Sequence, residues 1–190
     1  MKRKFYDVLL DWKAKRADKY AVLIDGARRV GKSWIAETFA RQEYGHYLVI
    51  DFANVPAKVR RYFNEYLNDL DRFFMLLFAA YHVELLPRGS LIIFDEVQRF
   101  PRAREALKYL VADGRYHYIE TGSLISINRN VRDIVIPSEE RHFKMYPLDW
   151  WEFLEATGRG GAIPLVRECF LRNQKLDEDL HRDLMGAFRE

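Results

Sequence analysis

The chain has 190 residues, of which 49% are hydrophobic and 31% are charged, so it can bury the core of one domain with a small appendage. The 31 lysines and arginines barely exceed the 28 aspartates and glutamates, and a net charge of +3 gives no strong electrostatic case for nucleic-acid binding. The single cysteine excludes an intrachain disulfide, and the five scattered histidines lack zinc-ligand spacing.

The sequence predicts a cytoplasmic protein that does not enter a membrane. Residues 1–20 are basic, but Asp7 and Asp11 interrupt any apolar signal core. The longest apolar run, 73–81, is far shorter than the roughly 20 residues that cross a bilayer. We expect Cys169 to pack as a small apolar residue in a reducing compartment.

Five short apolar runs predict the strands of a sheet. The first three are almost continuously apolar, β-branched or aromatic, which is typical of strands buried on both faces. The runs cover residues 20–25, 47–52, 91–96, 116–122 and 142–147. Stretches with helical spacing separate them, and this alternation predicts an α/β fold with a parallel sheet.

Each of the first three crossovers carries apolar residues on one helical face. These residues are Ile35, Phe39 and Ala40 in the first, Leu67, Leu70, Phe74 and Leu77 in the second, and Ala106, Leu107, Leu110 and Val111 in the third.

Residues 25–34, DGARRVGKSW, join the first predicted strand to a helix. Gly26, Gly31, Lys32 and Ser33 fit the phosphate-binding pattern G-x-x-x-x-G-K-[ST]. Glycines let the backbone turn so that N–H groups face phosphate oxygens, and the helix start adds the positive end of its dipole. Lys32 would contact the β- and γ-phosphates, and the Ser33 hydroxyl would coordinate Mg²⁺.

The alternative is a strand-to-helix turn that contains these residues by chance, and the strand–loop–helix context weighs against it. We expect the nucleotide to contact Gly26, Ala27, Arg28, Arg29, Val30, Gly31, Lys32, Ser33 and Trp34.

Two further polar groups follow predicted strands. Asp95 and Glu96 end the third run. One acid would hold Mg²⁺ and the other would activate a water for attack on the γ-phosphate. The alternative is that they are two solvated acids that cap a strand. Thr121 and Ser123 end the fourth run. They could contact the γ-phosphate or the attacking water, or they could cap a helix, and the sequence favours neither.

The pattern changes after the fifth run. Residues 148–158 read as an amphipathic helix that ends at Gly158, and helical patterns follow at about 165–172 and 176–188. Trp150 and Trp151 could form a stacking platform for nucleic-acid bases, but their spacing favours packing within the tail. We expect an α/β core over residues 1–148 and a helical lid over residues 149–190 that stops inside or near a helix.

The segments GARRVGKS, DEVQ, TGS and PLDWWEFL stand in this order along the chain. Together they resemble prokaryotic AAA-type ATPases, a P-loop group with an additional strand and a catalytic glutamate, and the resemblance covers nearly the whole chain. It implies a five-stranded parallel sheet in the order 5-1-4-3-2, sandwiched by helices, with the phosphate loop after the first strand. It also implies ATP rather than GTP as the nucleotide.

The resemblance assigns roles to matching positions. Lys32 and Ser33 take the phosphate-loop roles, Asp95 takes the magnesium role and Glu96 becomes the catalytic base. Thr121 or Ser123 falls at the first sensor position.

Three other positions are weaker candidates. Gln98 could sense the nucleotide state. Arg141 is a candidate arginine finger that would reach the γ-phosphate of a neighbouring subunit in a homo-oligomer, although a surface charge is the commoner role of an arginine. Phe5 and Tyr6 could pack on the adenine base.

The function that these features predict is Mg²⁺-dependent ATP hydrolysis coupled to conformational change in an attached module. An ATP-binding switch or interaction scaffold with negligible hydrolysis is the alternative. Similar proteins usually continue into a C-terminal region with a winged helix and a nuclease-like domain. We expect this chain to be truncated before that region, through which nucleic acid would become a partner.

Overall fold

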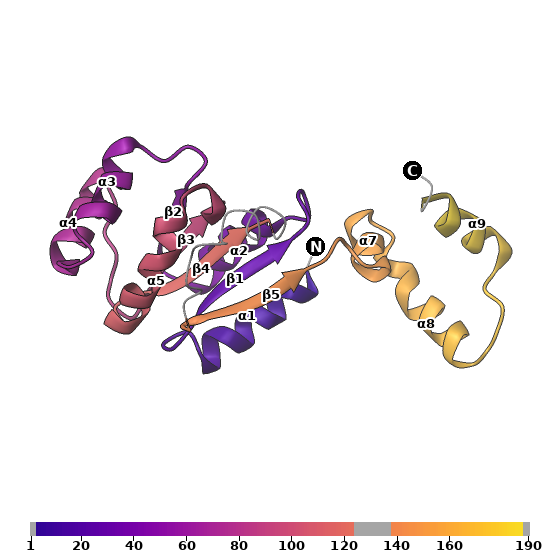
Figure 1. The fold of residues 1–190 in the computed structure, drawn as a ribbon. Helices are drawn as coiled ribbons and strands as arrows, with labels where there is room; N and C mark the ends of the chain where they lie inside the picture. Colours follow the sequence, from indigo (N-terminus) through magenta and orange to yellow (C-terminus); the bar gives the residue numbers. More distant parts are fainter. Residues whose placement is uncertain (1–2, 124–137, 188–190) are drawn as a thin grey trace. The chain divides into compact units, whose positions relative to one another are not determined.

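The computed structural model describes residues 3–123 and 138–187. The chain divides into two compact units (Figure 1). The core unit is Arg3–Pro147, and the helical unit is built on residues 148–190. None of the described helices combines the length and the apolar character that crossing a bilayer requires.

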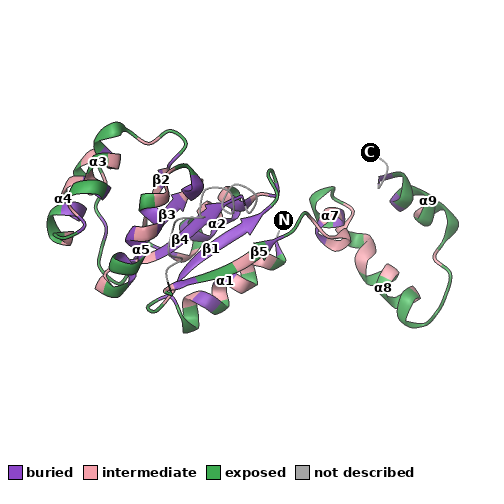
Figure 2. Ribbon diagram, viewed as in Figure 1, coloured by how far each residue is buried: buried purple, intermediate pink, exposed green. Residues whose placement is uncertain are grey.

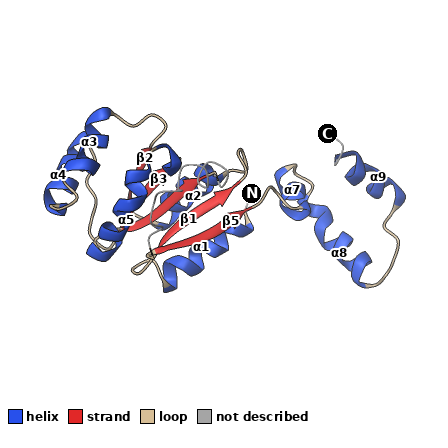
Figure 3. Ribbon diagram, viewed as in Figure 1, coloured by secondary structure: helices blue, strands red, loops and turns tan. Residues whose placement is uncertain are grey.

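Five parallel strands form the sheet of the core unit in the order β2-β3-β4-β1-β5 (Figure 3). This arrangement confirms the predicted α/β fold and the order 5-1-4-3-2. The strands are β1 (Ala21–Gly26), β2 (His46–Asp51), β3 (Ser90–Asp95), β4 (His117–Gly122) and β5 (Glu140–Met145).

Helices cover both faces of the sheet, and each face has its own apolar core (Figure 1). On one face lie α1 (Lys4–Lys15) and α2 (Lys32–Glu43). On the other lie α3 (Ala57–Glu65), α4 (Leu70–Tyr81) and α5 (Pro101–Asp113), together with the short 3₁₀ helix η1 (Val97–Arg99). The apolar faces predicted for α2 and α5 are buried as expected.

Strand β2 is less buried than its apolar sequence predicts. β1 is buried throughout, whereas in β2 only Leu48 and Ile50 are buried, His46 is exposed, and the other residues are half-exposed. The reason is that β2 lies at an edge of the sheet, so one of its sides has no neighbouring strand. The prediction of burial on both faces therefore holds for β1 and β3 and is wrong for β2.

The second crossover, between β2 and β3, contains two helices, α3 and α4, where the apolar spacing predicted one helical face. Leu67 is buried in the turn between α3 and α4, although its spacing placed it on one face with Leu70. Asp69 starts α4, where its side chain accepts a hydrogen bond of 3.1 Å from the backbone N–H of Arg72. This capping interaction sets the helix boundary that apolar spacing alone did not reveal.

A buried ion pair joins α5 to the edge strand β5. The Arg104 guanidinium donates to both oxygens of Glu140, with N–O distances of 2.7 and 2.8 Å. The two side chains are only 2% and 0% exposed. Burial alone would raise the pKa of Glu140, but hydrogen bonds from Arg104 and His142 outweigh it and hold the pKa at about 2.

A second buried carboxyl, that of Glu120 in β4, lies beside this pair. Burial and the charge of Glu140 hold the pKa of Glu120 well above its ordinary value. Glu120 therefore keeps its proton to a higher pH than an ordinary glutamate, because burial and the neighbouring charge of Glu140 both disfavour its charged form. In that form it can donate a hydrogen bond to Glu140.

The helical unit contains α7 (Trp150–Ala156), the 3₁₀ helix η2 (Gly160–Ala162), α8 (Ile163–Leu171) and α9 (Glu178–Ala187). Most of its described residues are exposed or only partly buried (Figure 2). A capping box of Asp149 and Glu152 begins α7. The helix ends at Ala156, just before Gly158, which was the predicted end. The predicted lid role of this unit stays a prediction.

The two tryptophans of α7 are half-buried and contact other residues of the helical unit. Trp150 stacks on Phe153 with ring centroids 5.8 Å apart, and the Arg167 guanidinium lies 4.9 Å from the ring centroid of Trp151. Both contacts support the packing interpretation over a stacking platform for bases.

We predict that Arg104→Met will lower the free energy of unfolding by about 3–5 kcal/mol, because it leaves the Glu140 carboxylate buried without its partner. Arg102→Met is the matched control on the same helix. Arg102 forms an exposed ion pair with Glu105, and losing such a pair costs about 1 kcal/mol or less. Urea denaturation measures both variants, and equal effects would contradict the structural role of the buried pair.

Glu120→Gln should change how stability depends on pH. In the wild type, Glu120 keeps its proton when folded and loses it in the unfolded chain above its ordinary pKa of 4.5. Stability therefore falls by about 1.4 kcal/mol per pH unit from this group until the folded pKa is reached. Glutamine does not titrate, so the variant should gain stability relative to the wild type between pH 5 and pH 7. Urea denaturation at both pH values tests this, and a constant difference would contradict it.

Candidate functional site

The loop between β1 and α2 is seated against the end of β5. Gly26 begins the loop, and a Cβ atom at this position would lie 2.3 Å from the carbonyl oxygen of Met145. No larger residue fits without moving the backbone. Gly31, at the other end of the loop, has a φ of 93°, a left-handed conformation that glycine adopts without strain. The two glycines of the motif therefore each meet a steric requirement.

Gly31 also sets the chemistry of the helix start. It is the residue that precedes the first turn of α2. Because glycine has no side chain, it cannot cap the first N–H groups of α2 as serine or aspartate would. These groups carry the positive end of the helix dipole, which favours a bound anion.

The Lys32 ammonium is held within the loop. Its side chain is buried, and Nζ donates to the carbonyl oxygens of Gly26 and Ala27 at 3.2 and 2.8 Å. Burial lowers the pKa of Lys32, and the charges of Glu96, Asp95 and Asp25 oppose this effect. The three carboxylates therefore help to keep a buried cation charged.

Hydroxyl groups from two different elements meet one carboxylate. Ser33 Oγ, on α2, donates to Asp95 Oδ1 at 2.7 Å. Thr121 Oγ1, on β4, donates to the same oxygen. Asp95 is the last residue of β3. The predicted metal ligands Ser33 and Asp95 are thus adjacent, as two ligands of one ion must be.

The residues present fit Mg²⁺. This ion prefers oxygen ligands and commonly binds through one or two protein side chains, with waters and substrate phosphates completing its octahedron. Ser33 and Asp95 would supply two such oxygens. Among the described residues, no cluster of three or more His, Cys, Asp or Glu side chains could hold a metal, which excludes a site of that kind only there.

Glu96 adopts an unusual backbone conformation beside this group. Its φ of 54° and ψ of 43° are left-handed, which is uncommon for a residue other than glycine and costs free energy. Its backbone N–H donates to Thr121 Oγ1 at 3.2 Å, and its carboxylate accepts a hydrogen bond from Gln98 Nε2. Thr121 therefore contacts both members of the acid pair, whereas the helix-capping alternative would have directed it to a helix start.

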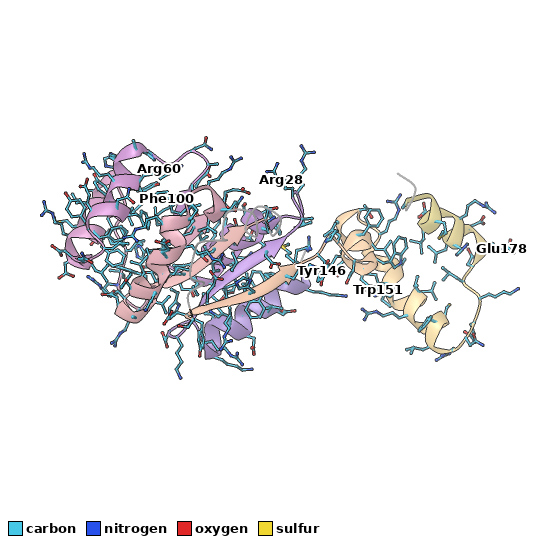
Figure 4. The ribbon with its side chains drawn as sticks, viewed as in Figure 1. Arg28, Arg60, Phe100, Tyr146, Trp151 and Glu178 are labelled. Atoms are coloured by element: carbon cyan, nitrogen blue, oxygen red, sulfur yellow. The ribbon has the colours of Figure 1, made fainter. Side chains whose placement is uncertain are left out.

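A cleft of about 690 Å³ opens at this end of the core unit. It is lined by Arg28, Arg29, Gly31, Lys32, Ser33, Trp34, Ala53, Glu96 and Arg99. Four of these residues are cationic and one is acidic, so the lining attracts anions. The side chains of Arg28, Arg29 and Trp34 are exposed, with Arg28 at the loop between β1 and α2 (Figure 4).

Arg60, on α3, joins the two other loops that line the cleft. Its guanidinium donates to the carbonyl oxygen of Phe52 at 2.9 Å and lies 5.0 Å from the ring centroid of Phe100 (Figure 4). Phe52 precedes Ala53, and Phe100 follows Arg99. Sequence reasoning missed Arg60, because a single arginine on a helix gives no signal of such contacts.

Two predicted positions, Ser123 and Arg141, neither line the cleft nor contact the Asp95 carboxylate in the hydrogen bonds of the described residues. Ser123 is buried just beyond β4. Arg141 pairs with Val22 near the start of β5, and its guanidinium lies 4.4 Å from the ring centroid of Tyr20. Arg141 lies near the start of β1, whereas the phosphate loop begins at the end of β1. Arg141 therefore does not reach the site of its own chain. Its role toward a neighbouring subunit stays a prediction.

The N-terminal aromatic residues pack into the core. Tyr6 meets Phe39 edge to face at 5.4 Å, and its hydroxyl donates to Glu43 at 2.8 Å. Phe5 also packs against this core, which includes α1, a helix that sequence reasoning did not predict. Neither residue lines the cleft, so the expectation of a base contact gains no support.

Comparisons with known proteins agree with the fold of the core unit. A family model described as an AAA domain matches residues 18–154, well over half of the chain. A closed-state cryo-EM reconstruction of Hsp104 with ATPγS and FITC-casein matches with a TM-score of 0.54 and 14% sequence identity, over 83% of this chain. At that identity the likeness shows the fold alone. No curated protein matches the sequence significantly.

The chain covers 28% of the Hsp104 chain, so it spans less than a third of that protein's length. The matched family region contains the loop 26–33, the acid pair and all five strands of the sheet. The chain therefore belongs to the AAA domain family, an AAA-type group of P-loop ATPases.

Proposed function

We propose that this chain binds ATP with Mg²⁺ in the cleft and hydrolyses it, and that hydrolysis drives conformational change in an attached module. One observation carries the proposal. The loop Gly26–Ser33, Asp95, Glu96 and Thr121 converge at the carboxyl edge of a parallel sheet, where ligands of α/β proteins bind.

Each side chain would act by its chemistry and position. The backbone of the loop and the start of α2 would hold the phosphates, and the Lys32 ammonium would neutralise their charge. Ser33 and Asp95 would hold the metal ion, which when bound neutralises charge on the phosphate oxygens. Glu96 would accept a proton from the attacking water. Thr121 would hold the Asp95 carboxylate and the Glu96 backbone in fixed positions relative to each other through its two hydrogen bonds.

The alternative is an ATP-binding switch with negligible hydrolysis. The hydrogen bond from Gln98 to the Glu96 carboxylate favours it in the state described here, because an engaged carboxylate is less free to accept a proton. The two functions differ in one property: only hydrolysis requires that the Glu96 carboxylate take part.

Lys32→Met should weaken ATP binding at least tenfold, because a hydrogen bond to a charged group contributes about 1.5–3 kcal/mol. Methionine keeps an apolar stem of similar length in the buried position. Lys108→Met, on the exposed face of α5, is the matched control. Isothermal titration calorimetry with ATP and Mg²⁺ measures both variants. An unchanged affinity in Lys32→Met would mean that the phosphates bind elsewhere.

Glu96→Gln and Asp95→Asn should have different effects although the residues are neighbours. Glu96→Gln should keep or raise ATP affinity, since it removes a negative charge, and should lower turnover by about 10²–10⁴ because it removes the base. Asp95→Asn should instead weaken the Mg²⁺ dependence of ATP binding.

A phosphate-release assay, combined with titration of a fluorescent ATP analogue with and without Mg²⁺, separates these outcomes. Turnover of Glu96→Gln at a measurable wild-type rate would contradict the base assignment. A wild type that binds ATP and releases no phosphate would favour the switch.

A further inference from the structure

A buried arginine outside the motif contacts the phosphate loop. Arg3 precedes α1 and is only 6% exposed. One guanidinium nitrogen donates to the carbonyl oxygen of Val30 at 3.2 Å. Another donates to the carbonyl oxygen of Tyr146 at 2.7 Å. A single side chain thus connects the start of the core unit, the phosphate loop and the residue that follows β5.

The two carbonyl groups belong to segments that already pack together. Gly26 lies against the Met145 backbone so closely that a Cβ atom would approach its carbonyl oxygen to 2.3 Å. The Met145 side chain reaches the far end of the loop, where its Cε lies 3.8 Å from the position of a Cβ atom on Gly31. In Figure 4 the loop is marked by Arg28 and the segment after β5 by Tyr146.

The middle of the loop needs such support. Ala27, Arg28 and Arg29 are exposed, and Arg29 has a φ of 65°, which is unfavourable for a residue with a side chain. If the loop occupies its binding conformation for only a fraction of the time, the apparent affinity for the bound phosphates is reduced by that fraction. The hydrogen bond from Arg3 holds the loop at Val30, which is buried and directly follows the exposed residues 27–29.

We propose that Arg3 is a positioning residue that fixes the phosphate loop in its binding conformation by tying it to the segment Met145–Tyr146. The effect on nucleotide binding rests on the proposed function. Because coupling between sites is reciprocal, a triphosphate that orders the loop also orders Tyr146 through the same side chain. Tyr146 is the next-to-last residue of the core unit, so this segment leads along the chain into the helical unit.

The test uses Arg3→Met, which keeps an apolar stem but removes the guanidinium, and Arg3→Lys, which keeps a charge but cannot reach both carbonyl groups as a fork. Arg16→Met, at the other end of α1 and exposed, is the matched control. We expect Arg3→Met to weaken binding of ATP with Mg²⁺ by about tenfold, as for a loop that is competent one tenth of the time. Arg3→Lys should recover part of the loss, and Arg16→Met should match the wild type.

Two readouts distinguish positioning from a general loss of stability. If the wild type turns over ATP, Arg3→Met should raise KM while kcat at saturating ATP is kept. Amide hydrogen exchange of the nucleotide-free chain should accelerate at Val30, Gly31 and Tyr146 in Arg3→Met but stay unchanged in β3 and α5. A non-hydrolysable ATP analogue should slow exchange at Tyr146 in the wild type and not in Arg3→Met.

The outcomes separate this inference from the proposed function. If the wild type fails to bind ATP, the proposed function is wrong, and the exchange of the nucleotide-free chain still decides the role of Arg3. Wild-type exchange at Val30 and Tyr146 in both Arg3 variants would overturn the inference. Acceleration spread evenly over the core unit would also overturn it, because it would reveal a purely structural residue.

Discussion

One carboxylate oxygen, Asp95 Oδ1, holds the candidate site together. It accepts hydrogen bonds from Ser33 at the start of α2 and from Thr121 on β4, while Asp95 itself ends β3. This interaction depends on the strand order, because β4 lies between β3 and β1 and the loop follows β1. A parallel sheet brings all these strand ends to one edge. The fold thus assembles a phosphate loop, an acid and a hydroxyl that are far apart in sequence.

Arginines outside the motif join the elements of the core unit, and two of them, Arg3 and Arg104, are buried. Arg104 ties α5 to β5, and Arg3 ties the phosphate loop to the residue after β5. Arg60 joins the loops after β2 and β3 on the other side of the cleft. A guanidinium suits this task because its planar fork donates in several directions at once and it stays charged when buried.

Local patterns in the sequence predicted the strands, the loop motif and the acid pair. Gly26, Lys32 and Asp95 stand at fixed offsets from apolar runs, and such offsets are visible without a structure. The helix α1 was missed because basic residues obscured the apolar positions Leu9 and Trp12. Arg3 and Arg60 were missed because an arginine reads as a surface residue, and their partners are carbonyl groups distant in sequence. The edge position of β2 follows only from the sheet order, which the residues of β2 do not encode.

The most direct test of this account is a crystal structure of the chain with a non-hydrolysable ATP analogue and Mg²⁺. We predict that the triphosphate lies along Gly26–Ser33 with the Lys32 ammonium within hydrogen-bonding distance of its oxygens. The metal ion should lie between Ser33 and Asp95, and the Glu96 carboxylate should face the γ-phosphate. A triphosphate bound elsewhere, or a loop that stays empty at saturating analogue, would contradict the account.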